Sequence, residues 1–270
     1  MKAELMITFS QLSDVGLLRS ENQDSCGKFP PDSNDLYSPQ GLLFVIADGM
    51  GGHRGGQQAS HMAVTNISRF YLENKEMEIP QRLFQAFQET NLKIHQFAQS
   101  NAEFQGMGTT CTCLALKNDR AYIAHVGDSR AYRIHRPAIE QLTHDHSQVA
   151  ELLRQGILTE KEARQHPQRN LLNRALGARP AIDADSFELT VSPGDHFLLC
   201  SDGLTRIEDE TLKEVVLTNT PDKACQKLVQ LANEMGGEDN VTVQVIRVDS
   251  ATSLREKLTT TFSGFWKKSK

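Results

Sequence analysis

Aspartates recur in this sequence where apolar segments end or turn, most of them beside glycine or a small polar residue. The five are Asp24 in RSENQD, Asp48 in LLFVIADG, Asp128 in AHVGDSRAY, Asp202 in LLCSDGL and Asp239 in GGEDNVTV. Carboxylates that converged without partners would repel one another, so we expect a metal as their counter-charge. Oxygen ligands without a Cys or His cluster favour Mg²⁺ or Mn²⁺.

Asp48 begins the most glycine-rich part of the chain, DGMGGHRGGQQAS. A P-loop needs a lysine followed by Ser or Thr after its glycines, and a dinucleotide loop needs G-x-G-x-x-G; this segment has neither pattern. Glycines after an aspartate let backbone carbonyls and water approach a bound metal. An isolated Asp-Gly pair also fits an ordinary turn. The second such pair, Asp202-Gly203 after another apolar run, favours the metal interpretation.

The elements that position these aspartates follow from hydrophobic periodicity. Expected strands are 5–11, 42–47, 109–117, 120–126, 129–135, 185–191, 195–200 and 241–248, and expected helices are 56–73, 81–100, 208–217 and 221–235. Pro221 suits the first turn of the last helix. A charged, partly helical insertion covers 144–180, with a capping-box pattern at 159–162. The grouping of strands and helices predicts an α+β fold with sheets packed against helices.

The composition excludes several classes of protein. The 270 residues, 39% of them hydrophobic, suit one large domain or two small ones. A net charge of −5 and a pI near 6.0 argue against a general nucleic-acid-binding protein. The chain shows no signal-peptide pattern and no apolar run of about 18 residues, so we expect no transmembrane segment. The five cysteines suggest free thiols in a reducing, cytoplasmic compartment, without a zinc site.

Six segments in order resemble the motifs of the metal-dependent protein phosphatases of the 2C type. They are RSENQD, VIADGMGGHRGG, MGTTCTCLAL, AHVGDSRAYRI, LLCSDGLT and GGEDNVTV. The resemblance covers about residues 5–248, and the insertion ARQHPQRNLLNRALG is similar to that of the bacterial branch. It implies a four-layer α-β-β-α sandwich with two central antiparallel sheets. It also implies a catalytic domain of residues 1–250, with a flap at about 144–180, and a C-terminal tail of residues 251–270.

The same resemblance implies a ligand set for two tightly bound Mn²⁺ or Mg²⁺ ions. Asp48 matches the aspartate that bridges both ions, and the Gly49 carbonyl matches a further ligand. Asp202 and Asp239 match ligands of the first ion. Asp24 matches an acidic position near the second ion, either as a ligand or as an acceptor for its waters.

Further roles follow from the family's motifs. Asp128 matches a ligand of a third, weaker ion, and Arg19 matches the phosphate-binding arginine. Gln23 departs from the pattern, because animal relatives carry a glutamate ligand there; bacterial-type sequences share the departure. His53, five residues after Asp48, stands where a general acid could protonate the leaving serine or threonine oxygen. A lone histidine also fits a surface or structural role.

The implied activity is hydrolysis of phosphoserine and phosphothreonine on proteins, by a metal-activated water at a binuclear Mn/Mg centre. Attack would be direct, since no cysteine stands in a phosphate-cradling loop. The implied partners are phosphorylated proteins and a bacterial Ser/Thr kinase that this enzyme, expected as a monomer, opposes in signalling. Two alternatives are a phosphate-binding module without catalysis, although no metal aspartate is missing, and a two-metal hydrolase of a phosphorylated metabolite or nucleotide.

Two parts of the chain keep alternative interpretations. The histidines His144, His146 and His166 lie in or beside the flap, and His166 fits either a substrate contact or a solvated surface. The tail, residues 251–270, carries apolar residues near helical spacing and lysines after Trp266. It fits a segment that docks on a membrane surface or a partner, or a frayed or self-packed terminus.

Overall fold

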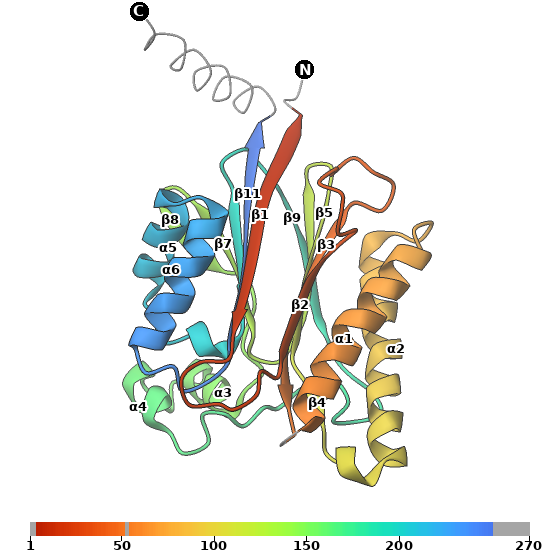
Figure 1. Cartoon of the computed structure of the whole chain (residues 1–270), viewed down its shortest axis with the longest axis vertical. Coiled ribbons are helices and arrows are strands. Elements are labelled where there is room, and N and C mark those ends of the chain that lie inside the picture. The colour runs from red at the N-terminus through yellow and green to blue at the C-terminus, as the bar shows by residue number, and fades with distance from the viewer. Residues whose placement is uncertain (1–3, 52–53, 251–270) are drawn as a thin grey trace, which may run out of the picture.

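Two antiparallel sheets lie face to face at the centre of the molecule (Figure 1). The computed structural model describes residues 4–51 and 54–250. The first sheet has the order β1 (Leu5–Asp14), β11 (Val241–Ser250), β10 (His196–Cys200), β7 (Arg130–His135) and β8 (Ala138–Gln141). The second has the order β2 (Asp24–Phe29), β3 (Leu42–Met50), β5 (Cys111–Lys117), β6 (Arg120–Val126) and β9 (Asp185–Thr190), with the short β4 (Gly108–Thr109) also paired to β3.

A pair of helices covers the outer face of each sheet (Figure 1). The pair α1 (Arg54–Glu73) and α2 (Ile79–Ser100) covers the second sheet, and the pair α5 (Asp209–Thr218) and α6 (Pro221–Glu234) covers the first. Two short helices, α3 (Gln148–Arg154) and α4 (Glu160–Gln165), lie in the insertion between β8 and β9. Single 3₁₀ turns form η1 (Ala102–Phe104) and η2 (Asp202–Leu204). The predicted α-β-β-α sandwich is confirmed.

Strand β3 shows how the sequence divides its apolar residues between two cores. Leu42, Phe44 and Ile46 pack in the core between the sheets, whereas Leu43 and Val45 pack beneath α1 and α2. Successive side chains of a strand point to opposite faces, so a strand that is buried on both faces reads as an unbroken apolar run. The run that ends at Asp48 is therefore the signature of a central strand in a layered fold.

Local signals in the sequence set two helix starts correctly. In α4 the Thr159 side chain accepts a hydrogen bond from the Glu162 N–H, and the Glu162 carboxylate accepts one from the Thr159 N–H, as the capping-box pattern predicts. In α6 Pro221 occupies the first turn, where its missing N–H removes no helical bond.

Two strands were not predicted. Strand β2, with the sequence DSCGKF, alternates poorly and contains Gly27; it is a strand because it pairs with β3 over its whole length. Strand β8, AIEQ, is short, lies at the edge of its sheet and, among the described strands, pairs with β7 alone. Among the described helices, none has both the length and the apolar character needed to cross a bilayer.

Candidate metal centre

The alternation along β3 carries Asp48 into the space between the two sheets. Asp48 shares its face of the strand with Phe44 and Ile46, which belong to the core between the sheets. Both backbone groups of Asp48, the N–H and the carbonyl, are hydrogen-bonded to Thr110. The Thr110 N–H donates to the Asp48 carbonyl at 2.9 Å, and the Asp48 N–H donates to Thr110 Oγ1 at 2.9 Å. The Asp48 side chain is therefore delivered by a rigid, central part of the sheet.

Asp24 lies directly across from Asp48 in the β2–β3 pairing and ties the two sheets together. Its Oδ2 accepts hydrogen bonds from Ser201 Oγ at 2.8 Å and from Thr242 Oγ1 at 2.7 Å. Ser201 follows β10 and Thr242 lies in β11, so both donors belong to the opposite sheet. Asp24 Oδ1 is buried and has no hydrogen-bond partner among the described residues.

The first sheet contributes Asp202 and Asp239. Asp202 opens η2 directly after Ser201. A Cβ at the next residue, Gly203, would lie 2.1 Å from the Asn240 carbonyl oxygen, so glycine allows this turn to pack against the segment that carries Asp239. Asp239 Oδ2 accepts a hydrogen bond from Arg19 Nη2 at 2.6 Å. These contacts bring the predicted arginine beside the carboxylates.

Asp128 occupies the predicted tight turn, between β6 and β7. Gly127 adopts a φ of +109°, which disfavours any side chain, and a Cβ there would lie 2.6 Å from the side chain of Thr110. Thr110 Oγ1 also forms a 2.6 Å hydrogen bond with Ser129 Oγ. The turn is thus packed against the residue that fixes the Asp48 backbone.

Burial and mutual repulsion raise the pKa values of four of these carboxylates. Burial raises the pKa of Asp24 to about 7, against hydrogen bonds from Thr242 and Ser201 that lower it. Burial raises the pKa of Asp202 to about 6, and the charge of Asp239 adds to the effect. The pKa values of Asp48 and Asp128 are also well above the usual range, first through burial and then through neighbouring carboxylates. Each group therefore lies within electrostatic reach of another.

These features fit divalent cations. Asp202 Oδ1, like Asp24 Oδ1, is a buried oxygen without a hydrogen-bond partner among the described residues. Across residues 4–51 and 54–250, no three His, Cys, Asp or Glu side chains gather closely enough to enclose one ion by themselves. Mg²⁺-like ions keep several waters and take one or two carboxylates each. The arrangement therefore suits ions that share carboxylates and complete their shells with water and backbone oxygens.

The glycines after Asp48 let backbone segments approach one another. A Cβ at Gly49 would lie 2.0 Å from the Gly56 carbonyl oxygen, at the start of α1, and 2.7 Å from the Gln23 carbonyl oxygen. The Gly49 N–H donates to that Gln23 carbonyl at 3.1 Å. Close packing of β2, β3 and α1 is therefore one reason for glycine here, beside the metal approach that the sequence suggested.

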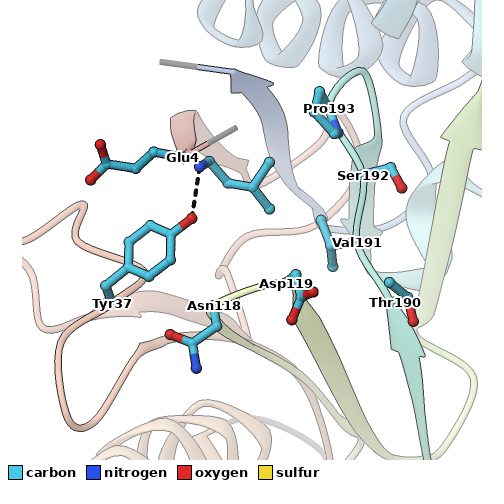
Figure 2. A pocket seen from close by; sticks show the side chains of 9 residues that line it. Glu4, Tyr37, Asn118, Asp119, Thr190, Val191, Ser192 and Pro193 are labelled. Atoms are coloured by element: carbon cyan, nitrogen blue, oxygen red, sulfur yellow. Dashed lines mark hydrogen bonds between the residues drawn. The ribbon is translucent and has the colours of Figure 1, made fainter. Parts of the chain in front are cut away.

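A cleft of about 810 Å³ leads away from the carboxylates. Asp128, Asp202 and Asp239 line it, together with residues of α3, α4, the start of α5 and the end of α6. The predicted flap thus borders the site. A second depression, of about 660 Å³, lies at the opposite end of the sheets, beside Leu5, Tyr37 and Asn118 (Figure 2). The described residues that line this depression include no Arg, Lys or His, so it is a poor phosphate site.

The structure brings most of the predicted site residues to one end of the sandwich. Asp24, Asp48, Asp128, Asp202 and Asp239 meet there with Arg19 and Gly49. His53 and the tail lie outside the described residues. Sequence reasoning missed the hydroxyl and amide groups that hold these carboxylates and the loop of Arg19. The missed residues are Thr110, Ser201, Asn240 and Thr242, whose signal was their polar character beside the aspartate motifs.

An α-β-β-α sandwich with buried carboxylates between its sheets and an arginine beside them defines the class of metal-dependent phosphatases. The family model for protein phosphatase 2C matches residues 19–243. Serine/threonine phosphatase stp of Listeria monocytogenes is 38% identical over 243 residues, which are 88% of this chain and 94% of that protein. The chain belongs to the protein phosphatase 2C family, and it is a metal-dependent protein serine/threonine phosphatase.

Solved structures agree with this assignment. The crystal structure of Stp1 from Staphylococcus aureus matches with a TM-score of 0.83 and 34% identity, over 92% of this chain and 97% of that chain. The catalytic domain of PstP, solved in complex with two manganese ions, matches with a TM-score of 0.79 and 31% identity, over 91% of this chain and 100% of that chain.

Removing metal should expose the repulsion between the carboxylates. With chelator present, Asp202→Asn should melt a few degrees above wild type, since relief of about 1 kcal/mol shifts Tm by about 2–4 °C in a chain of this size. A raised folded-state pKa means that the folded chain binds more protons than the unfolded chain. Wild-type Tm without metal should therefore fall as pH rises from about 4 to about 6, and the variant should show a weaker fall.

Calorimetry with chelator and with Mn²⁺ checks this expectation. The exposed Asp32, on the loop between β2 and β3, supplies a control variant, Asp32→Asn, that should match wild type throughout. A metal-free Asp202→Asn protein that melts below wild type at neutral pH would contradict the account.

Proposed function

We propose that this phosphatase hydrolyses phosphoserine and phosphothreonine at a binuclear Mn²⁺ or Mg²⁺ centre between its two sheets. Asp48 would hold both ions, and Asp202, Asp239 and the Gly49 carbonyl would supply further ligands. The observation that carries the proposal is the gathering of buried and half-buried carboxylates from both sheets. Two of their oxygens, Asp24 Oδ1 and Asp202 Oδ1, are buried and lack a hydrogen-bond partner among the described residues. Asp24 keeps one such oxygen for an ion or for its water, because hydrogen bonds from the opposite sheet occupy only the other.

The ions and the chain divide the chemistry between them. Bound Mn²⁺ or Mg²⁺ activates a water for attack and neutralises charge on the phosphoryl oxygens. Arg19 binds the phosphate, and its hydrogen bond to Asp239 raises the pKa of the guanidinium further above neutrality. About half of the Arg19 side chain is exposed (51%), so further N–H donors can reach a substrate.

The thiols do not provide a nucleophile for a competing route. Cys111, Cys113, Cys200 and Cys225 are buried and all five cysteines are free. Burial raises the pKa of Cys26 to about 12 and that of Cys200 to about 12, so these thiols stay protonated at working pH. This supports direct attack by water, without a phosphoenzyme.

The cellular role extends this proposal. Residues 1–250 form the catalytic domain, and the enzyme acts as a cytoplasmic monomer on phosphorylated proteins. Free cysteines suit a reducing compartment. A Ser/Thr kinase must supply its substrates, so we place the enzyme opposite such a kinase in bacterial signalling.

The first test compares phosphoserine, phosphothreonine and phosphotyrosine peptides in Mn²⁺, Mg²⁺ or chelator. The first two peptides should be hydrolysed with either ion, and chelator should abolish turnover. Asp48→Asn should lose roughly three or more orders of magnitude in kcat, even in excess Mn²⁺, because a shared ligand of both ions is lost. Near wild-type turnover by Asp48→Asn with metal still bound would refute the assignment.

Replacing Arg19 should mainly weaken substrate binding, because its charge is present for substrate and transition state alike. Arg19→Ala should raise KM for a phosphopeptide roughly 10–100-fold, the equivalent of hydrogen bonds to a charged group. Arg19→Lys keeps the charge but not the fork of donors, so its KM should lie between those of wild type and Arg19→Ala. Steady-state kinetics decide; a loss confined to kcat would remove Arg19 from phosphate binding.

The family resemblance suggests His53 as the general acid. This role can be tested with substrates whose leaving groups differ in their need for a proton. His53→Gln should lower kcat for phosphopeptides roughly 100-fold, because a serine alkoxide leaves poorly without a proton. The variant should keep most activity on p-nitrophenyl phosphate, whose phenolate leaves unprotonated. His61→Gln, at an exposed histidine of α1, is the control and should behave as wild type. Equal losses on both substrates would count against a proton-donating role.

A further inference from the structure

The depression of about 660 Å³ at the other end of the sheets, which we call the far-end depression, has walls from both sheets (Figure 2). Leu5 at the start of β1 belongs to the first sheet, and Thr190 at the end of β9 belongs to the second. Apolar and acidic groups line it together: Leu5, Val191, Pro193, the ring of Tyr37, Glu4 and Asp119. A ligand that suits this lining combines apolar side chains with positive charge.

Hydrogen bonds hold the walls of the far-end depression in place. The Leu5 N–H donates to the Tyr37 hydroxyl at 2.8 Å, which joins β1 to the loop between β2 and β3 (Figure 2). The Val191 N–H donates to the Asp119 carbonyl at 2.8 Å, which joins the chain after β9 to the turn between β5 and β6. The walls are therefore already ordered, and an occupant does not have to order them when it binds.

The described chain ends beside this depression. Ser250, the last residue of β11, pairs with Leu5 of β1. Strand β1 begins and β11 ends at the end of the sandwich that lies away from α3 and α4 (Figure 1). An extended chain advances about 3.3–3.6 Å per residue, so residues only a few positions after Ser250 can reach the depression. A segment tethered this closely has an effective concentration on the order of millimolar.

The tail that follows Ser250, residues 251–270, has a composition that suits the far-end depression. Its large apolar residues are Leu254, Leu258, Phe262, Phe265 and Trp266. Its five cations, against the one acidic residue Glu256, are Arg255, Lys257, Lys267, Lys268 and Lys270. The described residues that line the depression include Glu4 and Asp119 but no Arg, Lys or His. The tail and the depression therefore match in apolar character and are opposite in charge.

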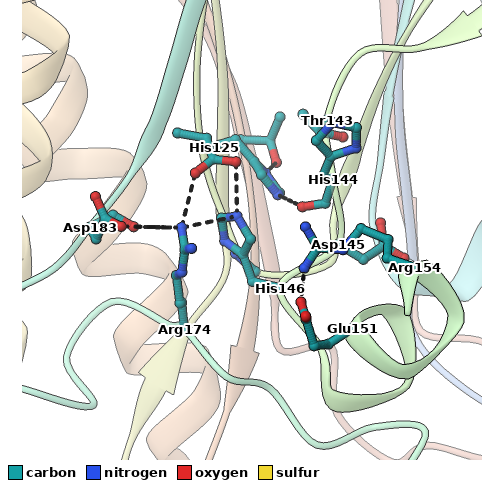
Figure 3. A network of polar contacts seen from close by, with 12 residues as sticks. His125, Thr143, His144, Asp145, His146, Glu151, Arg154, Arg174 and Asp183 are labelled. Atoms are coloured by element: carbon teal, nitrogen blue, oxygen red, sulfur yellow. Dashed lines mark hydrogen bonds and ion pairs between the residues drawn. The ribbon is translucent and has the colours of Figure 1, made fainter. Parts of the chain in front are cut away.

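Several carboxylates elsewhere already have an arginine beside them. In the flap, Arg174 contacts Asp183 (Figure 3). Arg120, which follows Asp119 in the chain, pairs with Glu188. The two carboxylates of the far-end depression share it with no such cation among the described residues that line it. Cations that arrive from the tail therefore gain more at the depression than at these paired sites.

We propose that the tail docks in the far-end depression of its own chain. Its apolar side chains lie against Leu5, Val191 and the Tyr37 ring, and its cations lie beside Glu4 and Asp119. An anionic membrane would attract the same cations, but the chain continues from the rim of a preformed acidic depression, which favours the intramolecular site. None of these residues belongs to the proposed metal centre, so the docking does not depend on the assignment of metal ligands.

Trp266 is the only tryptophan in the sequence, so tryptophan fluorescence of the whole protein reports on the tail alone. Docking removes the indole from water. We expect emission at a shorter wavelength, and weaker quenching by acrylamide, than from the same protein in denaturant. The double variant Glu4→Lys/Asp119→Lys should return both readings toward their values in denaturant. Salt at about 1 M, where the Debye length is about 3 Å, should shift wild type in the same direction.

Glu103→Lys is the matched control, because Glu103 is an exposed carboxylate on η1 that does not line the depression. It should keep the wild-type emission. Melting temperatures confirm that each variant is folded; if the double variant is not, Thr190→Lys, at an exposed residue of the wall, should show the same loss of docking. In every variant kcat on p-nitrophenyl phosphate should equal that of wild type, because the metal centre lies at the other end of the sheets.

Four results would overturn the proposal. One is a Trp266 in the native wild type that is as exposed to acrylamide as in denaturant. Another is a shorter-wavelength emission that the folded depression variants leave unchanged, because the tail would then dock elsewhere. A shift that appears only with vesicles containing anionic lipid would make the tail a membrane-binding segment. A shift that grows with protein concentration, together with a dimer in sedimentation, would place the tail on a second copy of the chain.

Discussion

The structure depends on carboxylates that are held close together between two sheets, where Asp24 is buried and the others are half-buried. Burial and like charge both disfavour their ionised forms, which the raised pKa values of Asp24, Asp48 and Asp202 express. Divalent cations reverse both penalties, because they supply opposite charge and accept the oxygens that lack protein partners. The apolar strands, the glycines and the hydroxyl donors around the site are the means by which the chain holds these groups in place.

Hydrogen bonds between the sheets join this end of the sandwich. Asp24 on the second sheet accepts from Ser201 and Thr242 on the first. Asn240 performs a similar task for the loop that carries Arg19: its side-chain Nδ2 donates to the carbonyls of Val15 and Glu21, and its Oδ1 accepts from the Gln23 N–H. The loop of Arg19 and the carboxylates, to which we assign phosphate and metal binding, are therefore positioned by one connected set of hydrogen bonds.

The sequence allowed most of the fold to be predicted, because its central strands are long and apolar and two helices begin with clear signals. Strands β2 and β8 escaped prediction, since pairing with a neighbour, rather than their own periodicity, makes them strands. The aspartates were recognisable because each lies at the end of a strand or in a turn. Ser201, Asn240 and Thr242 were not recognisable, because their role depends on which strands and loops lie opposite.

The central claim is that Mn²⁺ or Mg²⁺ ions bind between the sheets and share Asp48. Anomalous diffraction at the manganese edge, from crystals grown with Mn²⁺, tests it directly. The account predicts two strong peaks about 3.5–4 Å apart, both in contact with Asp48 oxygens, with Asp202 and Asp239 beside one of them. A weaker third peak should lie at Asp128. Manganese peaks outside the gap between the sheets, or an Asp48 carboxylate that touches no ion, would contradict the account.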